Sequence, residues 1–156
     1  MKRILLLLSL LFLCPIAAWA QGPTDETAAE AAVLAAWKEM DGAYARFNAE
    51  GALKYFRSDF EMKIGSQKIG REQMQELLQR QLADLKEQGG KTQASTSIFT
   101  FALEKPTLAR VYTITETTTQ LSSDAAAETS KEMRLEYWEN GPQGWMCKSG
   151  ELVQRD

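Results

Sequence analysis

The chain has 156 residues, with 18 basic and 21 acidic side chains and no histidine. The lack of histidine excludes Ser-His-Asp and Cys-His catalysis and every metal site with histidine ligands. The acidic balance, without any cluster of lysine and arginine, excludes a typical nucleic-acid-binding surface. No cofactor, metal or nucleic acid is therefore expected.

Residues 1–20 have the features of a secretory signal peptide. Lys2 and Arg3 precede an apolar run over 4–13, and Ala18-Trp19-Ala20 provides a small-x-small cleavage pattern. A membrane anchor is the alternative, but the run is about half of the roughly 20 residues that cross a bilayer. A lipoprotein acylated at Cys14 is less favoured still, because Pro15 follows directly. We expect a protein exported to the periplasm or the extracellular space, without a membrane anchor after cleavage.

Cleavage after Ala20 leaves 136 residues, enough for one domain with its own core. We expect a flexible leader over residues 21–27 and a single domain over 28–153. Only Cys147 remains in the exported chain, so an intramolecular disulfide is excluded.

Helical signals dominate the first half of the domain. The spacing predicts a long helix over 28–48, because large apolar side chains recur every three or four residues. A capping box at Thr27 to Glu30 begins it. A short helix over 52–57 and a third helix over 71–88 follow. The apolar stripe of the long helix contains Val33, Trp37, Met40, Tyr44 and Phe47.

In the second half of the domain, apolar residues recur at every second position, the spacing typical of β-strands. A brief strand over 60–64, with Lys68-Ile69 pairing back, precedes a strand from Thr92, a turn at Pro106 and a long strand over 108–121. The last hairpin covers 131–152. Its turn contains Asn140-Gly141-Pro142, which predicts a loop longer than two residues with proline outside the ladder. These elements indicate an α+β domain.

The order of these elements resembles the nuclear transport factor 2-like superfamily, especially its small secreted bacterial members and its polyketide-cyclase (SnoaL-like) and ketosteroid-isomerase relatives. The residues that carry the resemblance are Trp37, the segment NAEGALKYFRSDF from Asn48, Gly65 and Gly70 before Arg71-Glu72, and the hairpin Trp138…Gly144-Trp145. The resemblance implies a cone: a curved, mixed but mostly antiparallel sheet wrapped around the long helix, with a pocket at the open end.

The resemblance also indicates which residues to examine in a pocket. We expect the helix stripe to lie against the alternating residues 133, 135 and 137 of the last hairpin. The predicted pocket-lining side chains are Trp37, Met40, Tyr44, Phe56, Met133, Leu135, Tyr137 and Trp145. Cys147 shares a strand face with Trp145, which predicts a buried thiol.

Two functions from different classes follow. The first is a non-catalytic exported domain that binds a small apolar or amphipathic ligand, or a protein partner. The second is an isomerase, dehydratase or cyclase with non-standard acid/base residues, since the base position of ketosteroid isomerases falls near the apolar Ile64. Its candidates are Tyr112 as oxyanion donor, Glu116 as base and Arg110 as substrate anchor. Both sides of the strand over 108–115 are half apolar, which favours a homodimer through the outer sheet face.

Overall fold

The computed structural model describes residues 25–156; the predicted signal peptide and residues 21–24 of the predicted leader lie outside this range. The first helix, α1 (Asp25–Ala45), begins three residues before the predicted start. Residues 25–27 therefore belong to the helix, and the prediction that they form part of a leader is wrong. Asp25 and Glu26 lie in the first turn, where carboxylates interact favourably with the positive end of the helix dipole.

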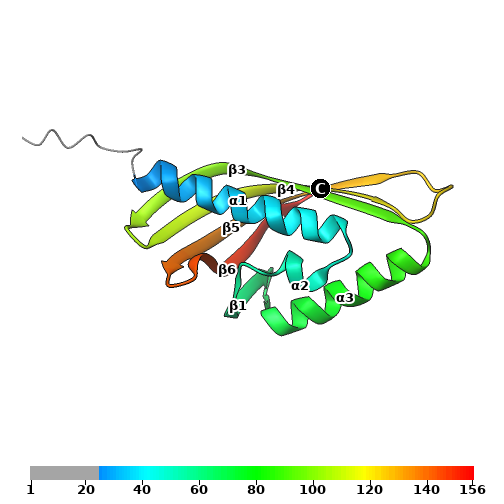
Figure 1. The fold of residues 1–156 in the computed structure, drawn as a ribbon, viewed down its shortest axis with the longest axis horizontal. Helices are drawn as coiled ribbons and strands as arrows, with labels where there is room; N and C mark the ends of the chain where they lie inside the picture. Colours follow the sequence, from blue (N-terminus) through cyan, green and yellow to red (C-terminus); the bar gives the residue numbers. More distant parts are fainter. Residues whose placement is uncertain (1–24) are drawn as a thin grey trace, which may run out of the picture.

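Two further helices and a six-stranded sheet complete the described fold (Figure 1). The remaining elements are α2 (Ala49–Ala52), β1 (Phe56–Ile64), β2 (Gln67–Gly70), α3 (Arg71–Glu87), β3 (Lys91–Lys105), β4 (Leu108–Gln120), β5 (Glu128–Gly141) and β6 (Gly144–Arg155). The strand order is β2-β1-β6-β5-β4-β3. Only the β1–β6 pair is parallel, so the sheet is mixed and mostly antiparallel, as predicted.

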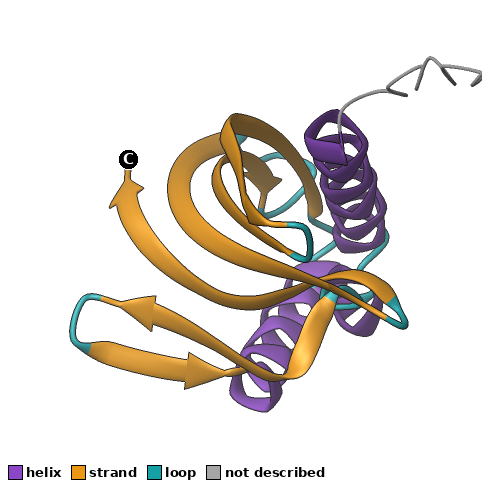
Figure 2. Ribbon diagram, turned by 90° about the vertical axis from the view of Figure 1, so that its left-hand side faces the viewer, coloured by secondary structure: helices purple, strands orange, loops and turns teal. Residues whose placement is uncertain are grey.

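The sheet is strongly curved, and the helices lie on its concave side (Figure 2). The α1 stripe faces this side as predicted, with Val33, Trp37 and Met40 all buried. Trp37 meets Phe56 edge-on at 5.9 Å between ring centroids, and Phe56 stacks on Phe60 at 4.3 Å. This aromatic row joins α1 to β1, so the core lies between the long helix and the inner face of the sheet.

The short helix α2 lies one turn earlier than the predicted 52–57. Asn48 is its N-cap, and the Asn48 side chain accepts a hydrogen bond of 3.0 Å from the Gly51 backbone N–H. This cap starts the helix at Ala49. The next strand can then begin at Phe56, within the segment that the apolar pattern assigned to the helix.

The turn of the last hairpin is shorter than predicted. Gly141 pairs with Gly144, so only Pro142 and Gln143 connect the two strands. Pro142 lies outside the ladder as expected. Gly144, directly after these two residues, has φ +83°, a conformation that glycine adopts at little cost.

The inward face of β5 is the opposite of the predicted one. Glu136 and Trp138 are fully buried on the helix side, and Arg134 lies on the same side. The prediction that α1 packs against Met133, Leu135 and Tyr137 is therefore wrong. Both faces of β5 carry apolar side chains, so alternation alone did not choose between them. The larger Trp138 ring fills the core, where it lies edge-on to Trp37 at 6.2 Å.

Candidate functional site: a cavity between the helices and the inner sheet face

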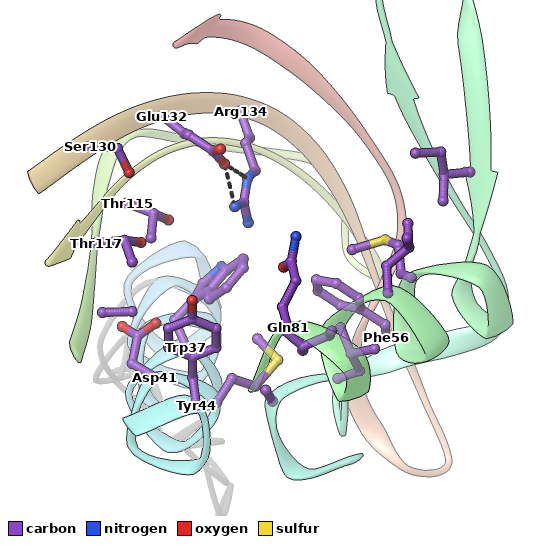
Figure 3. A pocket seen from close by; sticks show the side chains of 18 of the residues that line it. Trp37, Asp41, Tyr44, Phe56, Gln81, Thr115, Thr117, Ser130, Glu132 and Arg134 are labelled. Atoms are coloured by element: carbon purple, nitrogen blue, oxygen red, sulfur yellow. Dashed lines mark hydrogen bonds and ion pairs between the residues drawn. The ribbon is translucent and has the colours of Figure 1, made fainter. Parts of the chain in front are cut away.

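A cavity of about 420 Å³ lies between α1, α3 and the inner face of the sheet (Figure 3). Its volume falls within the range of ordinary small-molecule sites. One half of its wall is apolar and the other half is polar. The apolar half comprises Trp37, Met40, Ala52, Leu53, Phe56, Ile64, Ile69, Met74, Leu77, Leu78 and Ala94.

The polar half comes mainly from β4 and β5, the two central strands whose inward positions carry hydroxyl and charged groups. Because side chains alternate along a strand, Thr115, Thr117 and Thr119 of β4 share one face. Ser130, Glu132, Arg134 and Arg155 extend this wall across β5 and β6, while Asp41, Tyr44 and Gln81 complete it from the helices.

Glu132 is shared by two arginines. Arg134 donates to Glu132 Oε2 from Nη2 at 2.6 Å and from Nε at 3.2 Å. Arg155 Nε approaches Glu132 Oε1 at 3.1 Å. The Arg134 guanidinium also lies over the Trp37 ring, 5.8 Å from its centroid. A carboxylate and an aromatic face thus hold this guanidinium at the cavity wall.

Asp41 connects α1 to β3 at the side of the cavity. Its Oδ2 accepts from the Thr96 backbone N–H at 2.7 Å, and its Oδ1 accepts from the Thr96 hydroxyl at 3.0 Å. Desolvation by burial raises the pKa of Asp41, while the Thr96 hydrogen bonds and the charge of Arg134 oppose that rise. Asp41 is therefore a half-buried acid whose oxygens both have a partner.

Glu136 lies behind the cavity wall, where it is fully buried. Its Oε2 accepts from the indole N–H of Trp37 at 3.1 Å and of Trp138 at 2.9 Å, and its Oε1 accepts from Thr113 at 3.1 Å. Burial raises the pKa of Glu136 above its usual range, and the nearby positive charge of Arg134 and these three hydrogen bonds partly offset that rise. Glu136 also contributes to the raised pKa of Cys147, whose largest cause is burial.

The structure separates the predicted lining residues into two groups. Trp37, Met40, Tyr44 and Phe56 line the cavity. Met133, Leu135 and Tyr137 do not, because they lie on the opposite face of β5. Trp145 packs against the core cluster instead of the cavity.

The proposed catalytic trio is not at the cavity. Arg110, Tyr112 and Glu116 lie on the outer face of β4, since the alternate residues Val111, Thr113 and Thr115 are buried. Arg110 pairs with Glu104 at 3.3 Å and Glu116 with Lys131 at 3.1 Å, both on the surface. Their proposed catalytic role in the cavity is therefore wrong.

The predicted site did not include Asp41, Glu132 and Arg134 of the cavity wall, or Glu136 behind it. The available signal was the alternation Glu132-x-Arg134-x-Glu136-x-Trp138, which puts three charged groups in line with a tryptophan on one strand face. The expectation that residues 133, 135 and 137 face the helix implied that these charged residues face solvent, as they do in a strand with one wet face.

Within residues 25–156 there is no cluster of three cysteine or acidic side chains that could hold a metal ion. None of the helices in that range is long and apolar enough to cross a membrane.

Comparison with solved structures supports the cone fold. A putative scytalone dehydratase from Novosphingobium aromaticivorans matches with a TM-score of 0.71 at 13% identity, covering 85% of this chain and 89% of that one. An NTF2-like protein from the same species matches with a TM-score of 0.65 at 13% identity, covering 81% of each chain. A ketosteroid isomerase-like protein from Erwinia carotovora matches with a TM-score of 0.57 at 14% identity, covering 80% of this chain and 96% of that one. No protein-family model and no curated protein matches the sequence.

Proposed function

We propose that this chain, which has the nuclear transport factor 2-like cone fold, is an exported domain that binds a small amphipathic molecule in its cavity without converting it. The two-sided wall supports this proposal. The apolar half favours burial of a hydrocarbon body at about 25 cal/mol per Å². The hydroxyl and charged groups of β4 and β5 would fix the orientation of a polar end.

The proposal that the ligand is not converted rests on the contacts of the three acidic side chains in and behind the cavity wall. Asp41 is bonded to Thr96 through both oxygens, Glu132 is shared by two arginines, and Glu136 does not line the cavity. A general base must lie within hydrogen-bond reach of the proton that it removes, and hydrogen bonds or ion pairs that hold a carboxylate in place make it a weaker base. Ile64, at the position that resembles the ketosteroid-isomerase base, is an apolar part of the wall.

One observation favours the enzyme alternative. Asp41 lies in the cavity wall with a raised pKa, which is a common property of acid/base residues. An isomerase, dehydratase or cyclase of this fold would therefore use Asp41, and its Thr96 hydrogen bonds would have to yield to substrate. In that case Asp41→Asn would abolish turnover, whereas it would leave a pure binding domain able to retain its ligand.

Mass spectrometry of the purified exported protein tests the proposal. We expect a small molecule to be released on denaturation, and to be recovered with unchanged mass and unchanged chromatographic retention after prolonged incubation with the protein, since an isomerase would change the retention but not the mass. Thr117→Trp, which fills the cavity from β4, should lose this molecule. Thr118→Trp is the matched control, because Thr118 is the exposed neighbour on the other face. Equal occupancy in both variants, or a chemically altered ligand, would contradict the proposal.

Export is tested separately. We expect N-terminal sequencing of the exported form to begin at Gln21, directly after the predicted cleavage site. Protein that keeps Met1 and remains in the membrane fraction would contradict export as a cleaved protein.

A further inference from the structure

Arg134 is held at the cavity wall in a way that leaves part of its guanidinium unused. Its side chain is 20% exposed, its Nε and Nη2 both bond Glu132, and its guanidinium lies over the Trp37 ring. These contacts restrict the rotamers of a long side chain. The entropy normally lost when an arginine binds a ligand is therefore already lost in the free protein.

The remaining nitrogen, Nη1, makes no hydrogen bond to any residue of 25–156. Over the same range, no buried side-chain nitrogen or oxygen lacks a partner, so Nη1 is accessible to solvent, and the Arg134 side chain lines the cavity. Figure 3 shows the guanidinium pointing inward from β5 and the Gln81 side chain pointing toward it from α3. The Gln81 amide likewise bonds no other side chain or backbone group of residues 25–156. Donors from two opposite walls thus converge on one space.

The cavity wall carries two carboxylates and two guanidinium groups, so its formal charges balance without a ligand. Glu132 faces both Arg134 and Arg155, so one carboxylate accompanies two guanidinium groups. Asp41 is the other acid in the wall, and Thr96 occupies both of its oxygens. A ligand anion is therefore attracted locally, by the open Nη1 of Arg134, and not by a net charge of the wall. A second negative charge on its head group would add repulsion from Asp41 and Glu132.

We infer that the cavity takes a singly charged amphipathic carboxylate. Its carboxylate accepts hydrogen bonds from Arg134 Nη1 and the Gln81 amide. Its apolar body lies along Met40, Leu53, Met74 and Leu78. This assignment rests on the proposed binding function and names the chemical class of its ligand. The Arg134 guanidinium suits the planar carboxylate, and a charge-assisted hydrogen bond in a partly buried site is stronger than a neutral one.

Calorimetric titration with decanoate and with decan-1-ol, which share a chain length and differ in the head group, tests the inference. The full exported protein is used in three forms: wild type, Arg134→Gln and Arg110→Gln. Arg110 is the matched control, because it is an arginine in an ion pair on the outer face of the neighbouring strand. We expect wild type and Arg110→Gln to bind decanoate about 10- to 100-fold more tightly than decanol, the range for a hydrogen bond to a charged group.

Arg134→Gln should bind the two probes equally while keeping the affinity for decanol, with circular dichroism confirming the fold. Equal binding of the two probes by wild type, or a preference for decanoate that survives in Arg134→Gln, would overturn the carboxylate assignment and leave the binding function intact. Binding of neither probe by folded wild type would overturn the proposed amphipathic binding function itself, and the carboxylate assignment with it.

Discussion

Trp37 Nε1 on the long helix donates a 3.1 Å hydrogen bond to Glu136 Oε2 on β5, 99 positions later in the chain. Both side chains are buried, and the same oxygen accepts from Trp138. The bond joins the helix to the sheet at the back of the cavity. It also directs the Nε1 edge of Trp37 toward the core while Arg134 lies over the ring face.

Truncation of Trp37 should destabilise the protein strongly. We expect Trp37→Ala to lower the free energy of unfolding by about 3–5 kcal/mol, the cost of removing a buried large aromatic side chain. Trp37→Phe keeps much of the packing but removes one donor to Glu136, so a smaller loss of about 1–3 kcal/mol is expected. Urea denaturation followed by circular dichroism measures both values. A loss near zero for Trp37→Ala would contradict the burial of this ring.

Stability should depend on the protonation of Glu136. Burial raises its folded pKa above the ordinary 4.5. Between the unfolded and folded pKa values the native state binds more protons, so the free energy of unfolding falls as the pH rises through this interval. The pKa of Asp41 is also raised by burial, so Asp41 contributes to the pH dependence with the same sign. Glu136→Gln should weaken the decrease of the unfolding free energy with pH, because an amide does not titrate. The amide can still accept from both indoles and donate to Thr113, so the fold should be kept.

The measurement for this prediction is a set of denaturation curves from about pH 4 upward. Asp41→Asn serves as a comparison that removes the other raised acid and keeps Glu136. The groups around Glu136 are Arg134, Thr113, Cys147 and the two indoles. An unchanged slope in Glu136→Gln would show that this carboxyl does not hold its proton in the folded state.

Cys147 should react slowly with thiol reagents. It is fully buried, as predicted, and burial raises the pKa of its thiol well above the usual value, so little thiolate forms. Labelling with a maleimide under native conditions should be slow and should accelerate in denaturant. Immediate labelling, or a covalent dimer on a non-reducing gel, would contradict a buried structural thiol.

The outer sheet face is the expected dimer interface. Tyr112 pairs with Leu135 and Ile114 with Met133, which places four large half-buried side chains together on the face away from α1. We expect sedimentation to report a dimer, and Leu135→Glu to shift it to a monomer by placing a charge in an apolar contact. Lys86→Glu, an exposed change on α3, is the control. A wild-type monomer at high concentration would contradict this interface.

The sequence by itself determined the element types and most of their order. The 3.6-residue period over α1 and α3, and the two-residue period from Thr92 onward, come from local backbone geometry that any core must satisfy. Pro106 and Pro142 indicated the ends of strands, because proline has a fixed φ and no backbone N–H to donate to a ladder. The burial of Cys147 followed from the strand face that it shares with Trp145.

Only the tertiary structure decided which face of each strand turns inward. β4 and β5 carry apolar side chains on both faces, so a shift of one residue would turn Tyr112 and Met133 inward instead of Thr113 and Arg134. The choice depends on partners far away in sequence. Glu136 can be buried because Trp37, Trp138 and Thr113 donate to it, and Arg134 faces the cavity because Glu132 and the Trp37 ring hold it. No local pattern contains that information, because hydrogen bonds between distant elements exist only once the sheet has curved around the helix.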